Sequence, residues 1–398
     1  MKTADILILG AGCAGTLLAH YLGEEGFDGE IALCDARTSF DHEQRWCSWS
    51  DDRDDLSHLA TRKWRSWLVG DAQKTVIKSS TRYVYREIYA PNFFEHFHTA
   101  WRHKRGGQIR LFRGERVIKV EPQKDGVYVS TDRRKWRARL VFDARHRASP
   151  QSQTAPTKAP FKQDFVGWVV RLPQPAFDPA TVTLMDFQPS SADFLHFIYV
   201  LPYSANSALV ESTCFALGEI SREFHETSLT NYIRRKFGRD FEVVSEEAGL
   251  LPMHPIKPLQ MKNVHAIGVA GGCARPSSGY AFHRIQRQAR SIAEAIVRRK
   301  PIPQRVWPIK YGLFDELFLC TLARNFQEAA RFFVQLFERT DADALIRFMR
   351  DESTLEDDLS VIAALPKRPF IRTLFDRLVD SLISIGDVAQ ESPTKAKV

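Results

Sequence analysis

The sequence predicts an α/β protein, and three observations support that prediction. An apolar run, Ile6 to Leu9, leads into closely spaced glycines and then into a helix-like segment. A second apolar strand with glycines follows far downstream, at Val264–Cys273. Between them, residues 165–215 contain several strand-like segments separated by turn residues. Buried strands at both ends of a strand-rich insert are typical of a nucleotide-binding α/β fold.

The N-terminal glycines have the order that a dinucleotide turn requires. Gly10, Gly12 and Gly15 follow the apolar strand with G-x-G-x-x-G spacing, and the helix-like segment 16–22 comes next. The first glycine makes the tight turn, the second lets the backbone approach a pyrophosphate, and the third lets the helix pack on the strand. The phosphates then lie at the helix N-terminus. Asp35 ends a second apolar run about 20 residues later, where a ribose hydroxyl is expected.

The late glycine segment indicates which dinucleotide is bound. A simple NAD dehydrogenase does not need the chain to return to the site. In a flavoprotein, the N-terminal unit holds the adenosine end of FAD, and a late strand and helix complete the flavin end. The segment from Gly268 to Gly279, with a helix predicted over 277–299, has that place. The residues expected to contact FAD are Gly10, Ala11, Gly12, Cys13, Ala14, Gly15, Asp35, Ala36, Gly268, Gly271, Gly272, Pro276, Gly279 and Tyr280.

These elements divide the chain into three predicted parts. Residues 1–150 and 250–305 form a discontinuous Rossmann-type FAD-binding domain of the kind found in glutathione reductase and the hydroxylases. Residues 151–249 form an inserted antiparallel sheet for the substrate, with part of 65–100 as a candidate addition. Residues 306–390 form a helical C-terminal region.

Other elements are predicted between these landmarks. A short helix is expected near Leu56–Arg65, and a helix with Pro in its first turn at 91–101. Another helix is expected at 218–237, and the Pro-, Ser- and Thr-rich stretch 149–162 is interpreted as a linker or an exposed crossover. Apolar residues at helical spacings between Phe314 and Phe337 form either the core of a bundle or the wall or membrane-facing mouth of an apolar site.

The composition is that of a basic globular protein. Hydrophobic residues make up 44% and charged residues 26% of the 398, which excludes a disordered chain. The net charge is +8, but the basic residues form no single tract, so we expect no nucleic acid as partner. The six cysteines have no C-x-x-C spacing, which favours a reducing cytoplasm over a disulfide framework, and no metal site is predicted. No apolar run reaches the roughly 18 residues of a membrane span, which leaves association with a membrane surface open.

A set of short motifs runs in order along nearly the whole chain. They are Gly10–Gly15, Trp46–Trp49, Phe165–Trp168, Met185–Phe187, Tyr199–Pro202, Ala208–Thr213, Glu247–Met253 and Arg275–Tyr280. With these motifs the chain resembles the bacterial FAD-dependent lycopene β-cyclase family. The first motif is common to such flavoproteins, whereas those around Glu211, Pro252 and Gly279 are much more specific.

The resemblance implies a carotenoid substrate and a redox-neutral reaction. Lycopene, or another carotenoid with acyclic ψ end groups, would be converted to β-ionone rings by an isomerase of the intramolecular lyase type. The family requires FAD in its reduced form, with NAD(P)H as electron source. It also implies a cytoplasmic protein associated peripherally with a membrane, in which the substrate dissolves. The oligomeric state is not predicted.

This chemistry makes its own demands on the residues. A proton must reach the terminal double bond, the C5=C6 alkene then attacks the carbocation, and a proton finally leaves the new ring. The site therefore needs an acid kept protonated by apolar surroundings, aromatic faces towards the cation, and exclusion of water. Glu211, in a strand of otherwise apolar or small residues, is the predicted acid. Many family members carry a second acid directly after it, but Ser212 stands there, so Asp186 and Glu247 are the candidates for a second carboxylate.

Aromatic side chains supply the candidates for stabilising the cation. They are Trp46, Trp49, Trp168, Phe187 and Tyr280, and for each of them a place in the core is an equal alternative. His283 and Arg284 follow the late glycine turn, where a contact with phosphate or flavin is the alternative to the expected place on the surface of a helix.

Two other function classes stay open from the sequence. An FAD-dependent monooxygenase or halogenase shares the N-terminal motif, although the halogenase signature W-x-W-x-I-P is absent because Ile-Pro does not follow Trp46–Trp49. A non-enzymatic carotenoid-binding flavoprotein would form no product from lycopene and has no use for a carboxylic acid such as Glu211.

Overall fold

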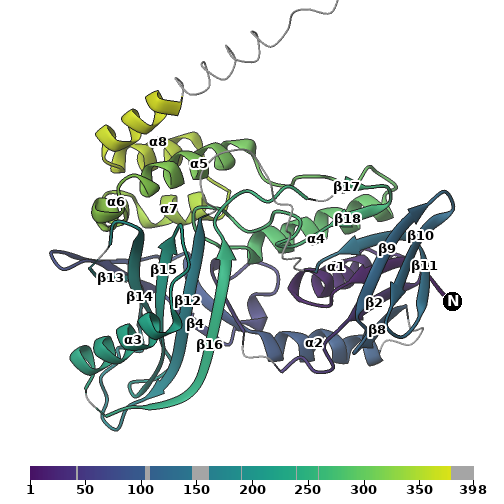
Figure 1. Cartoon of the computed structure of the whole chain (residues 1–398), viewed down its shortest axis with the longest axis horizontal. Helices are drawn as coiled ribbons and strands as arrows, with labels where there is room; N and C mark the ends of the chain where they lie inside the picture. Colours follow the sequence, from purple (N-terminus) through teal and green to yellow (C-terminus); the bar gives the residue numbers. More distant parts are fainter. Residues whose placement is uncertain are drawn as a thin grey trace, which may run out of the picture.

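The computed structural model describes residues 1–41, 44–103, 108–145, 161–189, 191–238, 240–258 and 260–377. Within these residues, three β-sheets are flanked by helices (Figure 1). The predicted linker at 149–162 lies outside the described residues except for its last two positions. The predicted α/β class is confirmed, with a strand-rich insert and a helical C-terminal region.

The N-terminal part forms an eight-stranded sheet with a parallel centre. Its parallel strands, in spatial order, are β18 (Val264–Ala266), β11 (Lys135–Asp143), β1 (Lys2–Leu9), β2 (Ile31–Asp35) and β8 (Ile109–Arg113). The antiparallel strands β17 (Gln260–Met261), β10 (Gly126–Thr131) and β9 (Val117–Gln123) extend it. Residues Ile6 to Leu9 are fully buried because both faces of β1 are covered. Since β18 pairs in parallel with β11, the late strand returns to the N-terminal sheet, as the sequence predicts.

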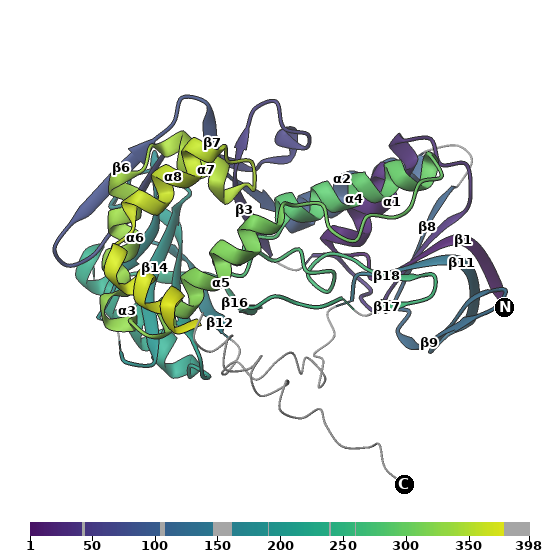
Figure 2. The same cartoon turned by 90° about the horizontal axis from the view of Figure 1, so that it is seen from above.

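Two helices far apart in the sequence pack together beside this sheet. They are α1 (Cys13–Glu24) and α4 (Phe282–Val297), and they lie side by side in both views (Figures 1 and 2). α4 begins five residues later than the predicted helix at 277–299. The preceding residues form a turn in which Gly279 has a φ of +72°, and the backbone N–H of Arg275 donates to the carbonyl of Tyr280.

The second sheet has seven strands and forms the floor of the candidate site. Their spatial order is β16 (Glu242–Pro252), β12 (Lys162–Arg171), β15 (Ser207–Ala216), β14 (Phe194–Pro202), β13 (Thr181–Phe187), β5 (Ser66–Gly70) and β6 (Thr75–Ser79). β5 and β6, from the stretch considered as a candidate addition, join this sheet by parallel pairing of β5 with β13. The helix α3 (Arg222–Lys236) packs on one face, and α6 (Phe326–Arg339) packs on the strands from the other side.

A third, three-stranded sheet consists of β3 (Arg45–Asp51), β7 (Tyr83–Tyr89) and β4 (Arg62–Trp64), and α2 (Ala90–His103) follows it. The helix predicted near Leu56–Arg65 is wrong apart from one 3₁₀ turn, Ser57–Leu59. The reason is tertiary. Trp64 is buried and its indole N–H donates to the carbonyl of Pro202, 3.2 Å away, which holds the segment extended against β7.

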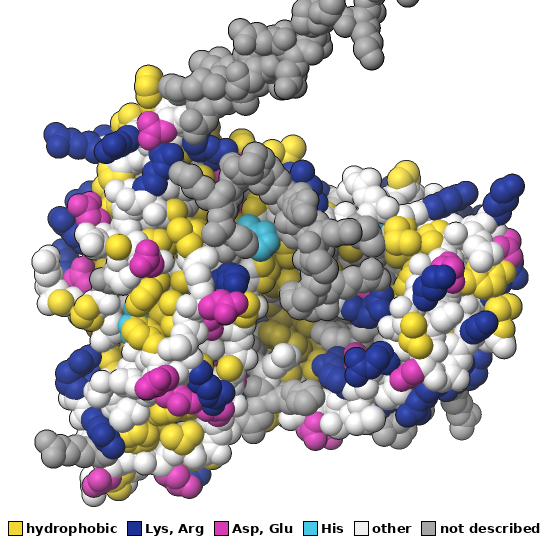
Figure 3. Space-filling model, viewed as in Figure 1, with side chains coloured by type: hydrophobic (Ala, Val, Ile, Leu, Met, Phe, Trp, Pro, Cys, Tyr) yellow, Lys and Arg dark blue, Asp and Glu magenta, His cyan; other side chains and the backbone are white. Residues whose placement is uncertain are grey.

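The C-terminal helices cover the cavity side of the second sheet. They are α5 (Ile309–Ala323), α6, α7 (Ala342–Met349) and α8 (Leu355–Ala364), and residues 367–377 are helical as well (Figure 2). Local sequence fixes the starts of α7 and α8. The Asp341 carboxylate caps α7, and Thr354 with Asp357 forms a capping box on α8. On the face shown in Figure 3, lysine and arginine side chains are scattered among acidic and apolar ones.

Buried ion pairs attach these helices to α4 and to the turn before it. The expectation that Arg284 lies on a helix surface is wrong, because it is 5% exposed and both its Nε and Nη2 donate to the Asp351 carboxylate at 2.6 and 2.8 Å. Arg275 pairs with Asp315 on α5 at 3.0 Å and with Asp351 at 3.6 Å. These ion pairs thereby connect α4, α5 and the segment after α7.

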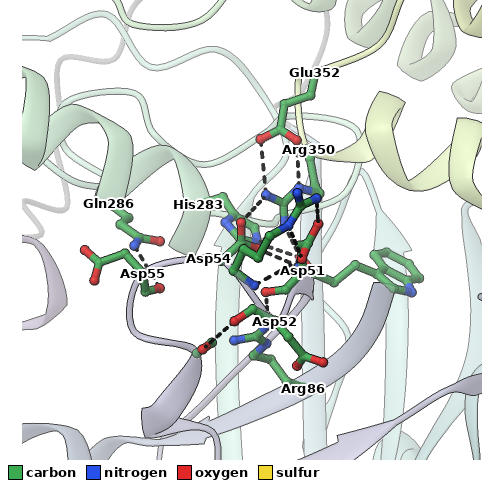
Figure 4. Close-up of polar contacts among 12 residues, drawn as sticks. Asp51, Asp52, Asp54, Asp55, Arg86, His283, Gln286, Arg350 and Glu352 are labelled. Atoms are coloured by element: carbon green, nitrogen blue, oxygen red, sulfur yellow. Dashed lines mark hydrogen bonds and ion pairs between the residues drawn. The ribbon is translucent and has the colours of Figure 1, made fainter. Parts of the chain in front are cut away.

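A neighbouring polar cluster strengthens the same attachment (Figure 4). The Arg350 guanidinium, at the end of α7, donates to both oxygens of Asp54 at 2.6 and 3.0 Å and to the carbonyl of Trp49 at 3.0 Å. His283 Nε2 lies 2.6 Å from the same carbonyl. Burial and the nearby Arg350 cation lower the pKa of His283 to about 3, so its imidazole is neutral and Nε2 donates.

We predict that Arg284→Ala lowers the free energy of unfolding by about 3–5 kcal/mol, because it removes one partner of a buried ion pair and leaves the Asp351 charge undercompensated. Urea denaturation checks this. The matched control is Arg298→Ala, which removes an exposed pair with Glu294 just beyond α4 and should change stability little. Equal effects of the two substitutions would contradict the role given to Arg284.

Candidate active site

The first glycine turn forms a cradle with an open helix N-terminus. Gly10 has a φ of +95°, and a Cβ on Gly15 would lie 2.0 Å from the Gly10 carbonyl oxygen, so both positions require glycine. Gly12 is the N-cap of α1, and Gly12, Cys13 and Ala14 line a large cavity. The free backbone N–H groups of the first turn make this end of the helix suited to an anionic group.

Asp35 supports this turn from the end of β2. Its Oδ2 accepts a hydrogen bond from the backbone N–H of Ala11 at 2.7 Å, and the carboxylate also accepts from the backbone and guanidinium of Arg37 at 2.8–3.0 Å. Burial favours the neutral acid, but these hydrogen bonds outweigh it and lower the pKa of Asp35. The predicted ribose ligand is thus also a brace for the glycine turn, and the neighbouring Ala36 is exposed.

The late glycine segment contacts the first one. A Cβ on Gly268, whose φ is +66°, would lie 2.6 Å from the Cβ of Ala14, and its backbone N–H donates to Gln288 Oε1 at 2.8 Å. The predicted residues of this segment divide into two groups. Gly268, Gly271, Gly272 and Pro276 shape the loop, whereas Gly279 and Tyr280 line the cavity.

The cavity itself has a volume of about 1270 Å³. It extends from the first glycine turn across the second sheet to α8 and the helical residues after it. This volume exceeds the roughly 300–1,000 Å³ of ordinary small-molecule sites, so there is room for a cofactor and a long ligand together. Most of its lining is apolar, and Phe314, Phe333, Leu336 and Phe337 show that the C-terminal apolar stripe serves both as core and as cavity wall.

Two acids stand side by side on the cavity face of the second sheet. In the strand register, Gly167 on β12 is opposite Glu211 on β15 and also opposite Glu247 on β16. Paired residues in neighbouring strands point to the same face, so both carboxyl groups face the cavity, where both line the wall. A Cβ on Gly167 would lie 3.2 Å from Glu247 Cγ and 3.5 Å from Glu211 Cβ. It would also lie 3.1 Å from Leu209 Cδ1, so a side chain here would crowd both acids and the row favours glycine between them.

Glu211 is held in its protonated form near neutral pH. It is 9% exposed, and burial together with the charge of Glu247 raises its pKa to about 8. The Thr213 hydroxyl, which donates to Glu211 Oε1 at 2.6 Å, and the Arg45 cation act in the opposite direction and are outweighed. A carboxylic acid of this kind can donate a proton into an apolar site.

Glu247 has a cationic partner from a different sheet. Arg45, on β3, donates from Nη1 to Glu247 Oε2 at 2.9 Å, and its Nε lies 3.8 Å from Glu87 Oε2. Tyr203 donates to the same Glu87 oxygen at 3.0 Å. The Arg45 side chain is 9% exposed, so the pair is largely shielded from water.

Aromatic side chains surround the same part of the cavity. Trp46 and Trp49 both line it, and the Trp49 ring lies 4.9 Å from that of Tyr85 and 5.7 Å from that of Tyr280. The Tyr85 hydroxyl is hydrogen-bonded to Tyr199 at 2.9 Å and to Tyr280 at 3.1 Å. Tyr199 pairs with Glu211 in the strand register, and Tyr85, Tyr280 and Trp49 join it in one aromatic cluster on the cavity wall.

Three of the candidates do not reach the cavity wall. Asp186 accepts hydrogen bonds from Tyr232 and Lys236 of α3, at 2.7 and 2.5 Å. Trp168 lies on the same α3 side, because it follows Gly167 in the strand, and its indole donates to Glu246 at 3.2 Å. Phe187 is buried against Phe197 and Phe333, which line the cavity in its place.

Ser212 also points away from the cavity. Successive strand residues face opposite sides, so the position after Glu211 lies under α3. There the Ser212 hydroxyl bridges His196 Nε2 and His225 Nδ1, each 2.9 Å away. Burial, with a contribution from His225, lowers the pKa of His196 to about 4. An acid at position 212 would therefore not share the cavity with Glu211, and the departure from the family pattern leaves the cavity unchanged.

Sequence reasoning missed Arg45, Tyr85 and Tyr199 on this wall and Gly167 between the two acids. Only Gly167 carried a local signal, since a glycine inside a strand often marks a close approach. Arg45, Tyr85 and Tyr199 come from separate strands, and their meeting depends on the packing of the third sheet on the second.

Comparison with known proteins places this arrangement in context. The model of the family described as "Lycopene cyclase protein" matches residues 5–375. A neoxanthin synthase from Solanum tuberosum is 24% identical over 309 residues, covering 74% of this chain and 60% of the relative. A capsanthin/capsorubin synthase from Citrus sinensis is 27% identical over 121 residues, covering 28% of this chain and 24% of the relative. The chain thus spans about 60% of the length of the first of these plant proteins.

Solved structures share the fold at low sequence identity. A geranylgeranyl bacteriochlorophyll reductase-like protein from Thermoplasma acidophilum has a TM-score of 0.62 at 16% identity, covering 94% of this chain and 99% of that one. A flavoprotein/dehydrogenase from Cytophaga hutchinsonii has a TM-score of 0.61 at 11% identity, covering 97% and 100%. The flavin-dependent brominase Bmp2 has a TM-score of 0.60 at 14% identity, covering 96% and 100%.

We predict that Ser212→Ala lowers stability by about 1–3 kcal/mol, because two buried imidazole nitrogens lose their shared partner. Chemical denaturation followed by circular dichroism checks this. The control is Ser204→Ala, in the turn before β15, where the hydroxyl accepts from the exposed backbone N–H of Asn206 and little change is expected. A stability equal to that of the unsubstituted protein would contradict the bridging role of Ser212.

Proposed function

Because the chain belongs to the lycopene cyclase family, we propose that it converts the acyclic ψ end groups of lycopene, or of a related carotenoid, to β-ionone rings. The observation that carries the proposal is Glu211, a buried carboxylic acid on the wall of a large, mostly apolar cavity. An apolar cavity suits a hydrocarbon substrate, and an acid kept neutral by its surroundings suits the protonation of an alkene.

The reaction proceeds without net change in atoms or electrons. Glu211 donates its proton to the terminal double bond and becomes a carboxylate. The C5=C6 alkene attacks the resulting carbocation and closes the ring, and loss of one proton from the ring gives the cyclic product. Trp46, Trp49 and Tyr280 stabilise the cation with their ring faces, and the apolar lining excludes the water that would capture it.

The residues of the two glycine segments fit FAD. The open N-terminus of α1, at Gly12 and Cys13, suits the pyrophosphate, and the position of Gly15 allows close packing of the helix on β1. Asp35 and Ala36 would lie towards the adenosine end, and Gly279 with Tyr280 towards the flavin end. When bound in its reduced form, FAD supplies negative charge near the cation, and NAD(P)H is the proposed source of its electrons.

We also propose that the protein works at a membrane surface, reached from the cavity through α8 and residues 367–377. Six large apolar side chains are 49–73% exposed there: Leu355, Leu359, Ile362, Ile371, Leu374 and Phe375. Four of them, Leu359, Ile362, Ile371 and Leu374, also line the cavity. Exposed Lys367, Arg368 and Arg372 are suited to anionic headgroups. No helix within the described residues has both the length and the apolar character that crossing a membrane requires.

We predict that the protein produces cyclic carotenoid in cells that accumulate lycopene, and that Glu211→Gln lowers the yield by roughly 10²-fold or more, because the proton donor is lost. Pigment analysis by chromatography gives the result. In vitro, the rate should fall as the pH rises through about 8, where Glu211 loses its proton.

Glu246→Gln is the matched control, since the neighbouring acid on β16 lies on the α3 side and pairs with Arg222. Unchanged lycopene in the presence of folded, flavin-loaded protein would reject the cyclase. Substrate-dependent oxygen consumption would favour a monooxygenase, and bound but unaltered lycopene a carotenoid-binding flavoprotein.

We predict that the double variant Leu355→Glu and Phe375→Glu weakens binding to lipid vesicles at least tenfold. Neither side chain lines the cavity, so the change adds charge to the exposed surface alone. Flotation with vesicles of phosphatidylcholine and phosphatidylglycerol measures the binding. Ile118→Glu, on the exposed side of β9, is the control, and equal binding by all three proteins would exclude this surface as the membrane contact.

A further inference from the structure

We propose that Arg45 is a positioning residue that keeps Glu247 as a carboxylate, and that this carboxylate takes up the proton released by the new ring. The two acids beside Gly167 would then have opposite roles, Glu211 as donor and Glu247 as acceptor. This inference rests on the proposed cyclase function and names the group that accepts the proton released by the new ring.

The first argument is the geometry of the sheet. Glu211, Gly167 and Glu247 occupy one row across β15, β12 and β16 and face the same cavity. Adjacent strands lie about 4.8 Å apart, so the backbones of the two acids are separated by roughly 9–10 Å. With no side chain at Gly167, no residue between the two acids displaces either of them from the cavity wall. A ring held in the cavity beside this row would be within reach of both carboxyl groups.

The second argument is the distribution of charge. Two carboxyl groups that share a buried site tend not to ionise together, so the surrounding residues decide which one keeps its proton. The 2.9 Å ion pair goes from Arg45 to Glu247, whereas Glu211 accepts a hydrogen bond from the neutral hydroxyl of Thr213. The guanidinium therefore favours the ionised form at Glu247, and that negative charge in turn favours the neutral form at Glu211.

The third argument is that Arg45 is held where it acts. Its Nε lies 3.8 Å from Glu87, and its guanidinium lies 5.4 Å from the centre of the Tyr89 ring. Burial alone would lower the pKa of Arg45, but the neighbouring Glu247 and Glu87 carboxylates act in the opposite direction and the pKa is raised, so Arg45 stays a cation. Neighbouring strands of the third sheet, β3 and β7, supply Arg45 and Glu87, and this sheet thereby sets the charge at the edge of the second.

Among the described residues, the titratable groups that face the two acids come from three strands, the turn after β14 and the late glycine turn. They are Arg45 and Cys47 on β3, Tyr85 and Glu87 on β7, Tyr199 on β14, Tyr203 after β14, and Tyr280. Burial raises the pKa values of the Cys47 thiol and of all four phenols, so these groups stay neutral over the working range. Of the groups named, Arg45, Glu87, Glu211 and Glu247 are then those that carry or change charge.

The proton balance follows directly. Protonation of the terminal double bond leaves Glu211 as a carboxylate, and deprotonation of the ring converts Glu247 to the acid. No electron is transferred and the carotenoid keeps its composition. One proton must then pass from Glu247 back to Glu211, directly or through solvent, before the next cycle.

The experiment compares the pH profiles of kcat for the unsubstituted protein, Glu247→Gln, Arg45→Met and Arg45→Lys, with lycopene supplied in phosphatidylcholine vesicles. We expect Glu247→Gln to lower kcat by roughly 10²-fold or more and to move the alkaline limb to lower pH by about one unit or more, because Glu211 loses a negative neighbour. We expect Arg45→Met to move both limbs to higher pH, since loss of the cation makes protonation of both acids easier. Arg45→Lys keeps a cation there and should restore most of the profile.

Glu246→Gln, on the opposite face of β16, is the control and should leave both limbs in place. Glu247→Gln leaves Arg45 beside Glu87, so it tests the inference even where Arg45→Met does not fold. Loss of kcat with both limbs unmoved in all variants would show a merely structural role and would overturn the inference while leaving the cyclase intact. Absence of cyclic product from the unsubstituted protein would instead contradict the proposed function, and this inference with it.

Discussion

The alternation of side chains along β15 is the constraint on which the candidate site depends. Val210, Glu211 and Ser212 are consecutive, and the pleat sends the middle one into the cavity and its two neighbours under α3. A shift of one residue in register would bury the hydroxyl of Ser212 in the cavity and place Glu211 against His196 and His225. The ten paired positions between β12 and β15, with the close packing of Leu209 beside Gly167, hold the register that prevents this.

Burial of the acid has a cost that the surrounding structure offsets. A carboxyl group removed from water favours its neutral form, and the Thr213 hydroxyl satisfies one of its oxygens. The other buried polar groups near the acids form hydrogen bonds and ion pairs mainly with residues outside the row of Glu211, Gly167 and Glu247. Arg45, Glu87 and Tyr203 form one connected group, and the phenols of Tyr85, Tyr199 and Tyr280 form another. These polar groups thus satisfy one another's hydrogen bonds, and the rest of the cavity lining can stay apolar.

Local patterns in the sequence predict the N-terminal glycine turn, but they do not predict contacts between residues that are far apart in the sequence. The glycine turn follows from the order strand, glycines, helix within fifteen residues, and the structure has that order because each step is local. The prediction of Glu211 as the acid rested on its apolar or small neighbours together with the resemblance to the family. By contrast, the partner of Glu247 is Arg45, 202 positions away, and no local pattern indicates that contact. The short helix expected near residue 60 is wrong for the same reason: pairing with β7 and burial of Trp64 override the local preference.

The same limit applies to the faces of the second sheet. Trp168 and Asp186 both lie in strands that line the cavity, and composition alone does not say which side of a strand faces inward. In the structure, the α3 side of the sheet is buried as well, because the aliphatic side chains of Val166, Val170, Val200 and Val210 pack under α3. With both faces buried, alternation no longer separates core from site. What separates them is the occupant of each face: α3 covers one side, whereas on the other the C-terminal helices share an apolar cluster with the sheet and also enclose the cavity. Arg275, Arg284 and Arg350 add ion pairs to that apolar attachment, and none of these pairs involves the row of acids. The helices above Glu211 are therefore held by apolar packing and by ion pairs outside this row, and neither attachment requires a charged partner for Glu211 itself.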